Sequence, residues 1–322
     1  MRTRFGQIEV ESSHPFSRPV LGQRTSPFLQ EKLIELGSDE VYGQVPGRIG
    51  RLLGIEVNQS QAYRCCQRAA GAIPEGAAIT PGPAMAAALG DERGTVYAMV
   101  DGSMLQLDGG WQEVKVGRVF TAAQVPDGQG FKWDIGPSSY VAKRGHYTGF
   151  AQAFEQALPP ESRCGQVFVT DGAQWIGQWI ARSYPAAAHV LDLFHVCEKP
   201  AAVAPGDGGA WLEKQKLELL HSNTGAVLAA LKGLPGGGEG AAAVAAYIEN
   251  HRDKMDYKRY RANGWMIGSG PVEAAHRTVL QVRMKRSGQR WAQTGCDNLI
   301  KLRVIYKNNK SFLVKNALKN AA

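Results

Sequence analysis

Thr95-Val-Tyr-Ala-Met-Val-Asp101 is a short apolar run that ends in an aspartate, and Gln166-Val-Phe-Val-Thr-Asp171 repeats this pattern seventy residues later. Runs of this length and composition are typical of buried strands. A strand fixes the Cα of the residue at its end, while the following loop leaves a carboxylate accessible. We therefore expect Asp101 and Asp171 at the ends of two strands of one sheet. The alternative is that each aspartate only begins a turn before a glycine.

The order of the elements around these runs predicts the α/β fold class. Strand patterns occupy 95–101, 112–116, 118–122, 139–142, 166–170 and 189–194, and helical patterns occupy 150–158 and 173–184. Early strands are thus followed by alternating helices and strands, an order typical of a sheet covered by helices. Periodicity alone supports the α/β class and no particular fold within it.

The N-terminal part of the chain is predicted to be helical. Residues 1–25 are polar and lack periodicity, so we expect a flexible arm. From Ser26 onward the pattern is helical, with a proline at the first helical position. A further helix, a turn at Gly54 and a helix at 58–68 have the order of a helix-turn-helix unit. Pro46 is expected to break the first helix of this pair.

The second helix of the pair carries polar side chains of the kind that contact bases. Its expected outer face includes Gln61, Arg64, Gln67 and Arg68. These side chains suit a recognition helix, so residues 26–71 are predicted to form a helix-turn-helix-like DNA-binding domain. A small packing bundle is the alternative. Residues 72–94 are rich in Ala, Gly and Pro and are expected to form a linker to the core at 95–195.

Positive charge is concentrated towards the C-terminus. The chain of 322 residues has a net charge of +8. Residues 251–322 hold sixteen Lys and Arg against four Asp and Glu, a net charge of +12, whereas the first 250 residues hold 21 against 25 and carry −4. A cationic region of this size favours a polyanion, above all nucleic acid. A solvated surface that only aids solubility is the alternative.

Gly268-Ser-Gly-Pro-Val-Glu273 has the pattern of a helix start, with proline at the first position and an acid where the helix dipole favours it. Basic residues follow on this segment, and we predict that they contact phosphate: Arg277, Arg283, Lys285, Arg286 and Arg290. Alternatively, Glu273 and Arg277 form only a surface ion pair of about 0.3 kcal/mol.

The composition argues against membrane and secreted proteins. No apolar run of ~18 residues occurs, and the first residues lack the apolar centre of a signal peptide. Five cysteines, an odd number without a C-x-x-C pair, argue against a disulfide framework and a thiolate zinc site. We expect a cytoplasmic protein without a membrane partner.

Four phrases in this order resemble the DD-E transposases of bacterial insertion sequences, in particular the ISKra-type group and its Mutator-like relatives. The first joins Asp101 to Trp111-Gln-Glu-Val-Lys-Val-Gly, and the second is Asp171-Gly-x-x-Trp. The third is Asp192-x-x-His195, and the fourth is Gly-Ser-Gly-x-Val-Glu273. The resemblance covers residues 26–305.

This resemblance implies a ribonuclease-H-like mixed sheet with helices on both faces. An all-helical insertion is expected at 196–263, and the helix with Glu273 and a basic C-terminal region at 264–322. Asp101, Asp171 and Glu273 would bind two Mg²⁺, with Mn²⁺ as a substitute, for in-line displacement at phosphorus. The implied function is cleavage of double-stranded DNA at transposon ends followed by strand transfer. The enzyme would act on the bacterial nucleoid as a homodimer or higher oligomer.

Asp192 and His195 are accessory residues in this resemblance, with an orienting or DNA-contacting role. A zinc cluster with Cys197 is the alternative, although a fourth ligand with suitable spacing is missing.

Other functions compete with transposition. A structure-selective nuclease of the same fold would cleave without joining, and a catalytically dead transposase relative would only bind DNA. A glycosidase with paired carboxylates is disfavoured by the basic tail.

Overall fold

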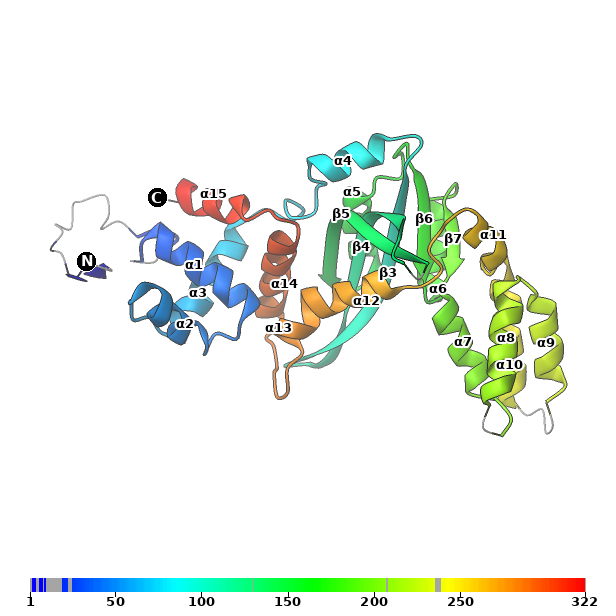
Figure 1. Ribbon diagram of the computed structural model, residues 1–322. Coiled ribbons are helices and arrows are strands. Elements are labelled where there is room, and N and C mark those ends of the chain that lie inside the picture. Colours follow the sequence, from blue (N-terminus) through cyan, green and yellow to red (C-terminus); the bar gives the residue numbers. More distant parts are fainter. Residues whose placement is uncertain are drawn as a thin grey trace.

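The computed structural model describes residues 25–128, 130–206, 208–234 and 239–321, together with short pieces before residue 23. Most of the arm expected at 1–25 lies outside the described residues. The described pieces of this region include a pair of two-residue strands, β1 (Arg2–Thr3) and β2 (Gly6–Gln7). Three parts follow one another along an elongated molecule (Figure 1). Helices of both chain ends form the first part, a sheet forms the middle, and a group of helices forms the third.

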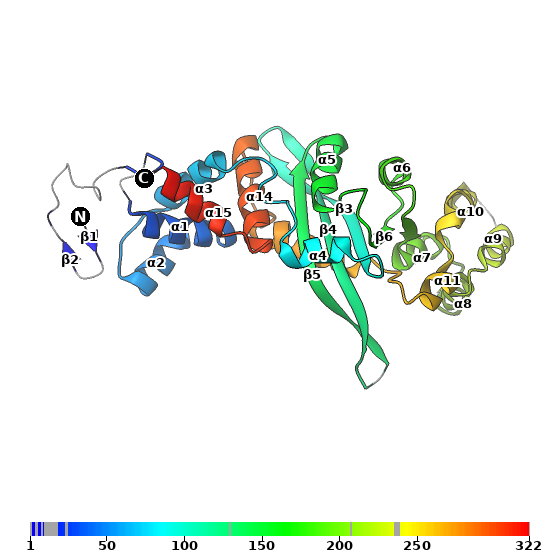
Figure 2. The same cartoon turned by 90° about the horizontal axis from the view of Figure 1, so that it is seen from above.

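The middle part is a five-stranded mixed sheet, so the predicted α/β class is confirmed. Its strands are β3 (Thr95–Leu107), β4 (Gly110–Pro126), β5 (Phe131–Arg144), β6 (Gly165–Thr170) and β7 (Ala188–Leu191), in the order β5-β4-β3-β6-β7. The first three strands are antiparallel to one another, whereas β6 and β7 run parallel to β3. The far ends of β4 and β5 project beyond the body of the protein (Figure 2).

The expected break between 112–116 and 118–122 is wrong, because both segments belong to the single strand β4. Gly117 lies inside this strand and does not separate two strands. A Cβ atom at this position would come within 2.4 Å of the Phe154 ring. Gly117 therefore allows helix α5 (Tyr147–Ala157) to lie close against the sheet.

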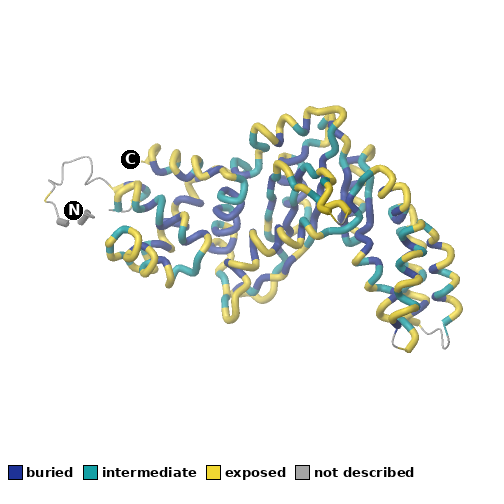
Figure 3. Tube along the Cα trace, in the orientation of Figure 1, coloured by how far each residue is buried: buried dark blue, intermediate teal, exposed yellow. Residues whose placement is uncertain are grey.

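Helices cover both faces of the sheet. On one face, α5 and α6 (Gln174–Ser183) pack Phe150, Phe154 and Trp179 against Phe168 of β6. Helix α4 (Pro83–Gly90) extends the same core with Met85 and Leu89, so part of the expected linker at 72–94 is a packed helix. On the other face lie α12 (Gly270–His276) and α14 (Gln293–Lys307). Buried residues accordingly follow the strands and the inner faces of these helices (Figure 3).

The described residues of segment 196–263 form a succession of helices, as expected. It contains the end of α7 (Leu193–Ala201), then α8 (Gly209–Leu220), α9 (Thr224–Lys232), α10 (Glu239–His251), the short η2 (Arg252–Lys254) and α11 (Tyr257–Ala262). The strand expected at 189–194 ends earlier, at Leu191. The reason is that Asp192 accepts a hydrogen bond from the backbone N–H of Phe194 and caps α7.

Three helices form the N-terminal part, α1 (Pro27–Asp39), α2 (Val45–Leu53) and α3 (Gln59–Ala72). Gly54 ends α2 in the left-handed conformation, and Asn58 caps α3. Pro46 does not break α2, because it stands in the first helical turn, where no backbone N–H is required. The C-terminal helix α15 (Phe312–Asn320) packs against α1 and α3.

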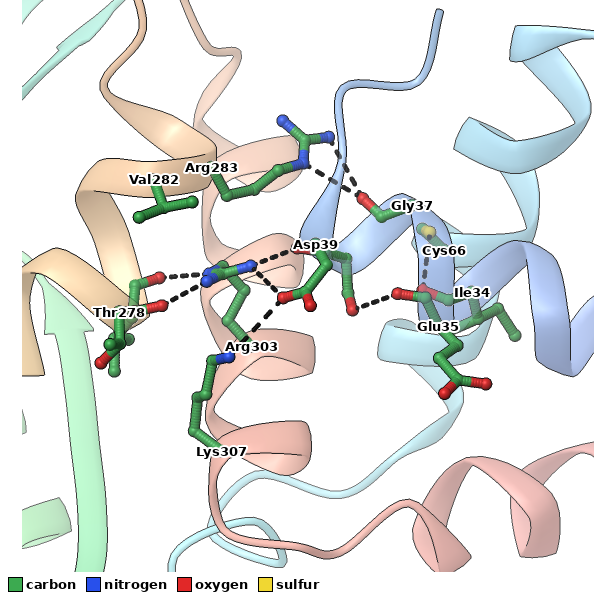
Figure 4. Close-up of polar contacts among 12 residues, drawn as sticks. Ile34, Glu35, Gly37, Asp39, Cys66, Thr278, Val282, Arg283, Arg303 and Lys307 are labelled. Atoms are coloured by element: carbon green, nitrogen blue, oxygen red, sulfur yellow. Dashed lines mark hydrogen bonds and ion pairs between the residues drawn. The ribbon is translucent and has the colours of Figure 1, made fainter. Parts of the chain in front are cut away.

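Two buried arginines fix the N-terminal helices against the segment that follows α12. This segment consists of a π-helical turn, η3 (Arg277–Gln281), and α13 (Val282–Met284). Arg283 donates to the carbonyl oxygen of Gly37 near the end of α1. Arg303 of α14 donates to the carbonyl oxygens of Thr278 and Ser38 (Figure 4). The first and middle parts of the molecule therefore share one polar, buried junction.

Candidate acidic site

The strand register brings three aspartates together. The parallel ladders place one residue of β3, one of β6 and one of β7 in a row: Met99, Val169 and Val190. Two positions further along the same segments stand Asp101, Asp171 and Asp192. Because strand side chains repeat every two residues, the register directs these side chains to one edge of the sheet.

Asp171 directly follows β6, as predicted, but Asp101 does not end its strand. β3 continues to Leu107, because it remains paired with β4 beyond the point where its pairing with β6 stops. Asp101 therefore stands where β6 separates from β3. This position leaves its carboxylate half-exposed, with 40% of the side chain accessible.

One cavity of about 240 Å³ is lined by all five predicted residues of the core: Asp101, Asp171, Asp192, His195 and Glu273. We call it the acidic cavity. An adjoining cleft of about 710 Å³ shares Asp101 and Glu273 with it and is also lined by Arg277 and Lys285. Residues from β3, β6, α7 and α12, far apart in the sequence, thus meet around one space. The lining of this cleft therefore combines acidic and basic side chains.

The Asp101 carboxylate has two close neighbours. Its Oδ1 accepts a hydrogen bond of 2.6 Å from the backbone N–H of Gly102, and its Oδ2 lies 3.4 Å from Nε2 of His276. Burial raises the pKa of Asp101 above its usual value, and the charge of His276 opposes this shift. Burial lowers the pKa of His276, which Asp101 opposes in turn. Near neutral pH, this environment therefore favours a neutral imidazole beside Asp101.

Asp171 is held by its own turn and by the helical insertion. Its Oδ1 accepts a hydrogen bond of 2.9 Å from the N–H of Ala173. Gly172 has a φ of 88°, which a side chain would strain. The hydroxyl of Tyr247 on α10 donates to the Asp171 carbonyl oxygen at 3.2 Å. The insertion therefore contacts the backbone of the acidic cavity.

Asp192 links two helices of this site through hydrogen bonds. It is buried, and its Oδ2 accepts hydrogen bonds from both the backbone N–H and the hydroxyl of Ser269. Ser269 immediately precedes α12, which carries Glu273. Asp192 therefore connects the start of α7 to the start of α12. His195 lies on the first turn of α7, with its Nδ1 3.4 Å from Oε2 of Glu198.

Glu273 is exposed on the first turn of α12. The surface ion pair considered for Glu273 and Arg277 is not among the ion pairs of the described residues. Both side chains instead line the cleft. Lys285, Arg286 and Arg290 are also exposed.

The expectation that Arg283 contacts DNA is wrong, because this side chain is 1% exposed. Its guanidinium lies over the rings of Tyr42 and Trp291, at 4.7 and 5.3 Å from their centroids, and donates to Gly37. Arg303 and Lys310 are buried as well. Part of the positive charge near the C-terminus is therefore used inside the fold.

The predicted recognition residues on α3 differ in what their side chains do. Gln61 accepts a hydrogen bond from the backbone N–H of Asn58 and completes a capping box. Gln67 accepts a hydrogen bond from Asn298, and Arg68 donates to the carbonyl oxygens of Leu21 and Gly22. Tyr63 and Arg64, in the middle of α3, are exposed. Of the predicted set, only Arg64 is both exposed and without a side-chain hydrogen bond within the described residues.

His276 is the residue of this site that the sequence analysis missed. Its position three residues after Glu273 places it one turn further along α12, towards the sheet. The Glu-x-x-His spacing was the only available signal, and it is weak because helices often carry a buried histidine.

The donor set suits a hard cation, since Asp101, Asp171 and Glu273 supply only carboxylate oxygens. In the described parts of the chain, no three His, Cys, Asp or Glu side chains converge closely enough to form a complete metal site. The acidic side chains line the cavity, but they do not converge on one point where an ion could be bound.

Among the described residues, no helix is long and apolar enough to cross a membrane. A scan against models of known protein families and a search of curated proteins find no match for this chain.

Proposed function

We propose that this chain is a metal-dependent DNA-cleaving enzyme of the DD-E transposase type. The observation that carries the proposal is that Asp101, Asp171 and Glu273 line one cavity, which Arg277 and Lys285 extend into a basic cleft. Acids for a divalent cation and cations for phosphate thus lie side by side. This combination suits the cleavage of a phosphodiester.

The strand order supports a ribonuclease-H-like core within this proposal. Three antiparallel strands are followed by two parallel strands added on the side of β3, in the order β5-β4-β3-β6-β7. The helical segment between α7 and α12 supports the same proposal, because Mutator-like enzymes are expected to carry a helical insertion between the last strand and the helix with the third acid. The helix with the third acid then returns to the sheet next to β3.

Each residue of the site has a role in the proposed reaction. Asp101, Asp171 and Glu273 would hold Mg²⁺, or Mn²⁺ in its place, because carboxylate oxygens are the ligands these ions prefer. Ions held by these residues would supply Lewis-acid chemistry for displacement at phosphorus. Arg277 and Lys285 would hold the phosphate, and Asp192 would keep α12 in place through Ser269.

DNA binding would rest on the exposed cations of 277–290 and on the N-terminal helices. Strand transfer, assembly on double-stranded DNA as a dimer or higher oligomer, and association with the bacterial nucleoid belong to the same proposal. They follow from the resemblance to insertion-sequence transposases.

Nicking of supercoiled plasmid DNA in Mg²⁺ by the purified full chain tests the proposal. Asp101→Asn, Asp171→Asn and Glu273→Gln should each reduce nicking at least 100-fold, whereas DNA binding in EDTA should change less than twofold. Asp253→Asn, which alters an acid of the insertion outside the acidic cavity, is the matched control. Nicking without strand joining would favour a nuclease. Binding without any nicking by the unaltered chain would favour a catalytically dead relative.

A further inference from the structure

His276 is a buried histidine with an unpaired ring nitrogen. The residue is 3% exposed, and its Nε2 has no hydrogen-bond partner within the described structure. Buried polar atoms in folded proteins are nearly always paired, so an orphan of this kind calls for an explanation. The carboxylate of Asp101 lies beside it, with Oδ2 3.4 Å from Nε2, and the backbone of Asp101 is also within reach of the imidazole.

We propose that His276 is a positioning residue for the acidic cavity: its Nε2–H donates to the Asp101 carboxylate and fixes the orientation of this acid. This inference rests on the proposed function, because it assigns Asp101 to a metal-binding set. The contact is slightly longer than a hydrogen bond. A small rotation of the Asp101 side chain, which is 40% accessible, would close the gap.

The position of His276 on α12 explains how this contact would affect the arrangement of the acids. Glu273 and His276 are one helical turn apart, so α12 supplies both an acid of the cavity and a donor to a second acid. Asp101 stands in the continuous strand β3, and Val272 and Ala275 of α12 are buried. A hydrogen bond from His276 would therefore set the distance between two acids that belong to different elements. Donors of this type behind acidic ligands orient them and tune their affinity for metal.

The tautomer of His276 provides a test that requires neither metal nor activity. Nitrogen-15 labelling of histidine in the metal-free full chain resolves which ring nitrogen carries hydrogen, and His276→Gln identifies the signal. We expect hydrogen at Nε2 of His276, and we expect Asp101→Ala to shift this signal. Hydrogen at Nδ1 alone, or a signal indifferent to Asp101→Ala, would overturn the positioning role.

Mn²⁺ binding, followed by the electron paramagnetic resonance of free Mn²⁺, gives the second test. His276→Phe, which keeps a planar ring without a donor, should weaken Mn²⁺ binding about 10- to 100-fold. His276→Gln, which restores an N–H donor, should recover most of this loss. Thr278→Ala, on the exposed side of the same segment, is the control and should bind like the unaltered chain. Melting curves identify any variant that fails to fold.

The outcomes separate the two proposals. Failure of the unaltered chain to bind Mn²⁺ would overturn the metal site of the proposed function, and the positioning role with it. Binding by the unaltered chain together with equal affinity in His276→Phe would overturn the positioning role alone. If His276→Phe does not fold, His276→Gln and the tautomer measurement still decide the matter.

Discussion

Arg303 and Asp39 form an ion pair of 2.9 Å between side chains that are 264 residues apart in the sequence. The guanidinium also donates to the carbonyl oxygens of Ser38, Thr278 and Val279. Two of these oxygens belong to the π-helical turn after α12, and the third lies near the end of α1. A single buried side chain thus connects the N-terminal helices to the segment next to Glu273.

Arg303→Met should lower the free energy of unfolding by about 3 kcal/mol, because it leaves buried carbonyl oxygens without donors. Asp39→Asn is the matched control. Asp39 is 60% accessible, so the loss of its charge should cost less than about 1 kcal/mol. Urea denaturation of both variants measures the difference. Equal effects of the two substitutions would show that the charge pair, and not the carbonyl contacts, holds this junction.

The salt dependence of DNA binding should depend on the exposed cations beside the cleft. Replacing Arg277, Lys285, Arg286 and Arg290 with glutamine should weaken binding to all DNA sequences. Each phosphate contact that is lost should reduce the slope of log affinity against log salt by about 0.9. Arg283 is left out of this set, because it is buried.

Arg93, Arg163 and Arg182 offer a control for this measurement. They are exposed and do not line the cleft or the acidic cavity. Their replacement with glutamine changes the net charge by a similar amount, and the slope should stay nearly constant. If both sets flatten the slope equally, binding follows net charge and not the basic cleft.

Local patterns predicted most of the sheet. Apolar runs before Asp101 and Asp171 identified β3 and β6, because buried strands carry a continuous apolar sequence. The same patterns failed at Gly117, which lies inside β4 and allows a helix to approach the sheet closely. Such a glycine is recognised only when the partner helix is known. The helix α4 was missed for a related reason, since its alanines and its proline are equally typical of a linker.

The acidic site was predictable as a set of residues but not as a geometry. Which strands are neighbours, and in which register, depends on contacts between distant segments. The sequence therefore could not reveal that Asp192 bonds to Ser269, or that His276 faces Asp101. It also could not distinguish Arg283, which is buried, from Lys285, which is exposed. Both are cations on one helical segment, and only the position of α1 separates them.

Stability should fall in mild acid because of His189. Burial, and next the charge of Lys254, lower its pKa to about 4, while Nε2 stands 2.8 Å from the Thr170 hydroxyl. The unfolded chain, in which histidine has a pKa near 6.5, then binds a proton that the folded chain does not. The free energy of unfolding should therefore decrease as the pH falls from about 6.5 to about 4, by at most ~3 kcal/mol.

Urea denaturation at pH 7 and pH 4.5 measures this effect. His189→Asn cannot take up a proton, so the part of the pH dependence that comes from His189 should disappear in this variant. His221→Asn, at the end of α8, is the matched control for replacing a histidine with asparagine. An unaltered profile in His189→Asn would assign the acid sensitivity to other groups.

Gln61→Glu distinguishes capping from base recognition on α3. Glutamate keeps the oxygen that accepts from Asn58, and its charge near the helix N-terminus is favourable by about 0.3–1 kcal/mol. If Gln61 only caps the helix, this variant should melt no earlier than the unaltered chain and keep its preference between DNA sequences. Gln61→Ala should lower the free energy of unfolding by about 1 kcal/mol without changing that preference.

Arg64→Ala should instead reduce discrimination between DNA sequences by about 1–3 kcal/mol, if α3 contacts bases through its exposed side chains. Competition binding beside melting curves measures both properties. A changed preference in Gln61→Glu at unchanged stability would return Gln61 to the set of base-reading residues.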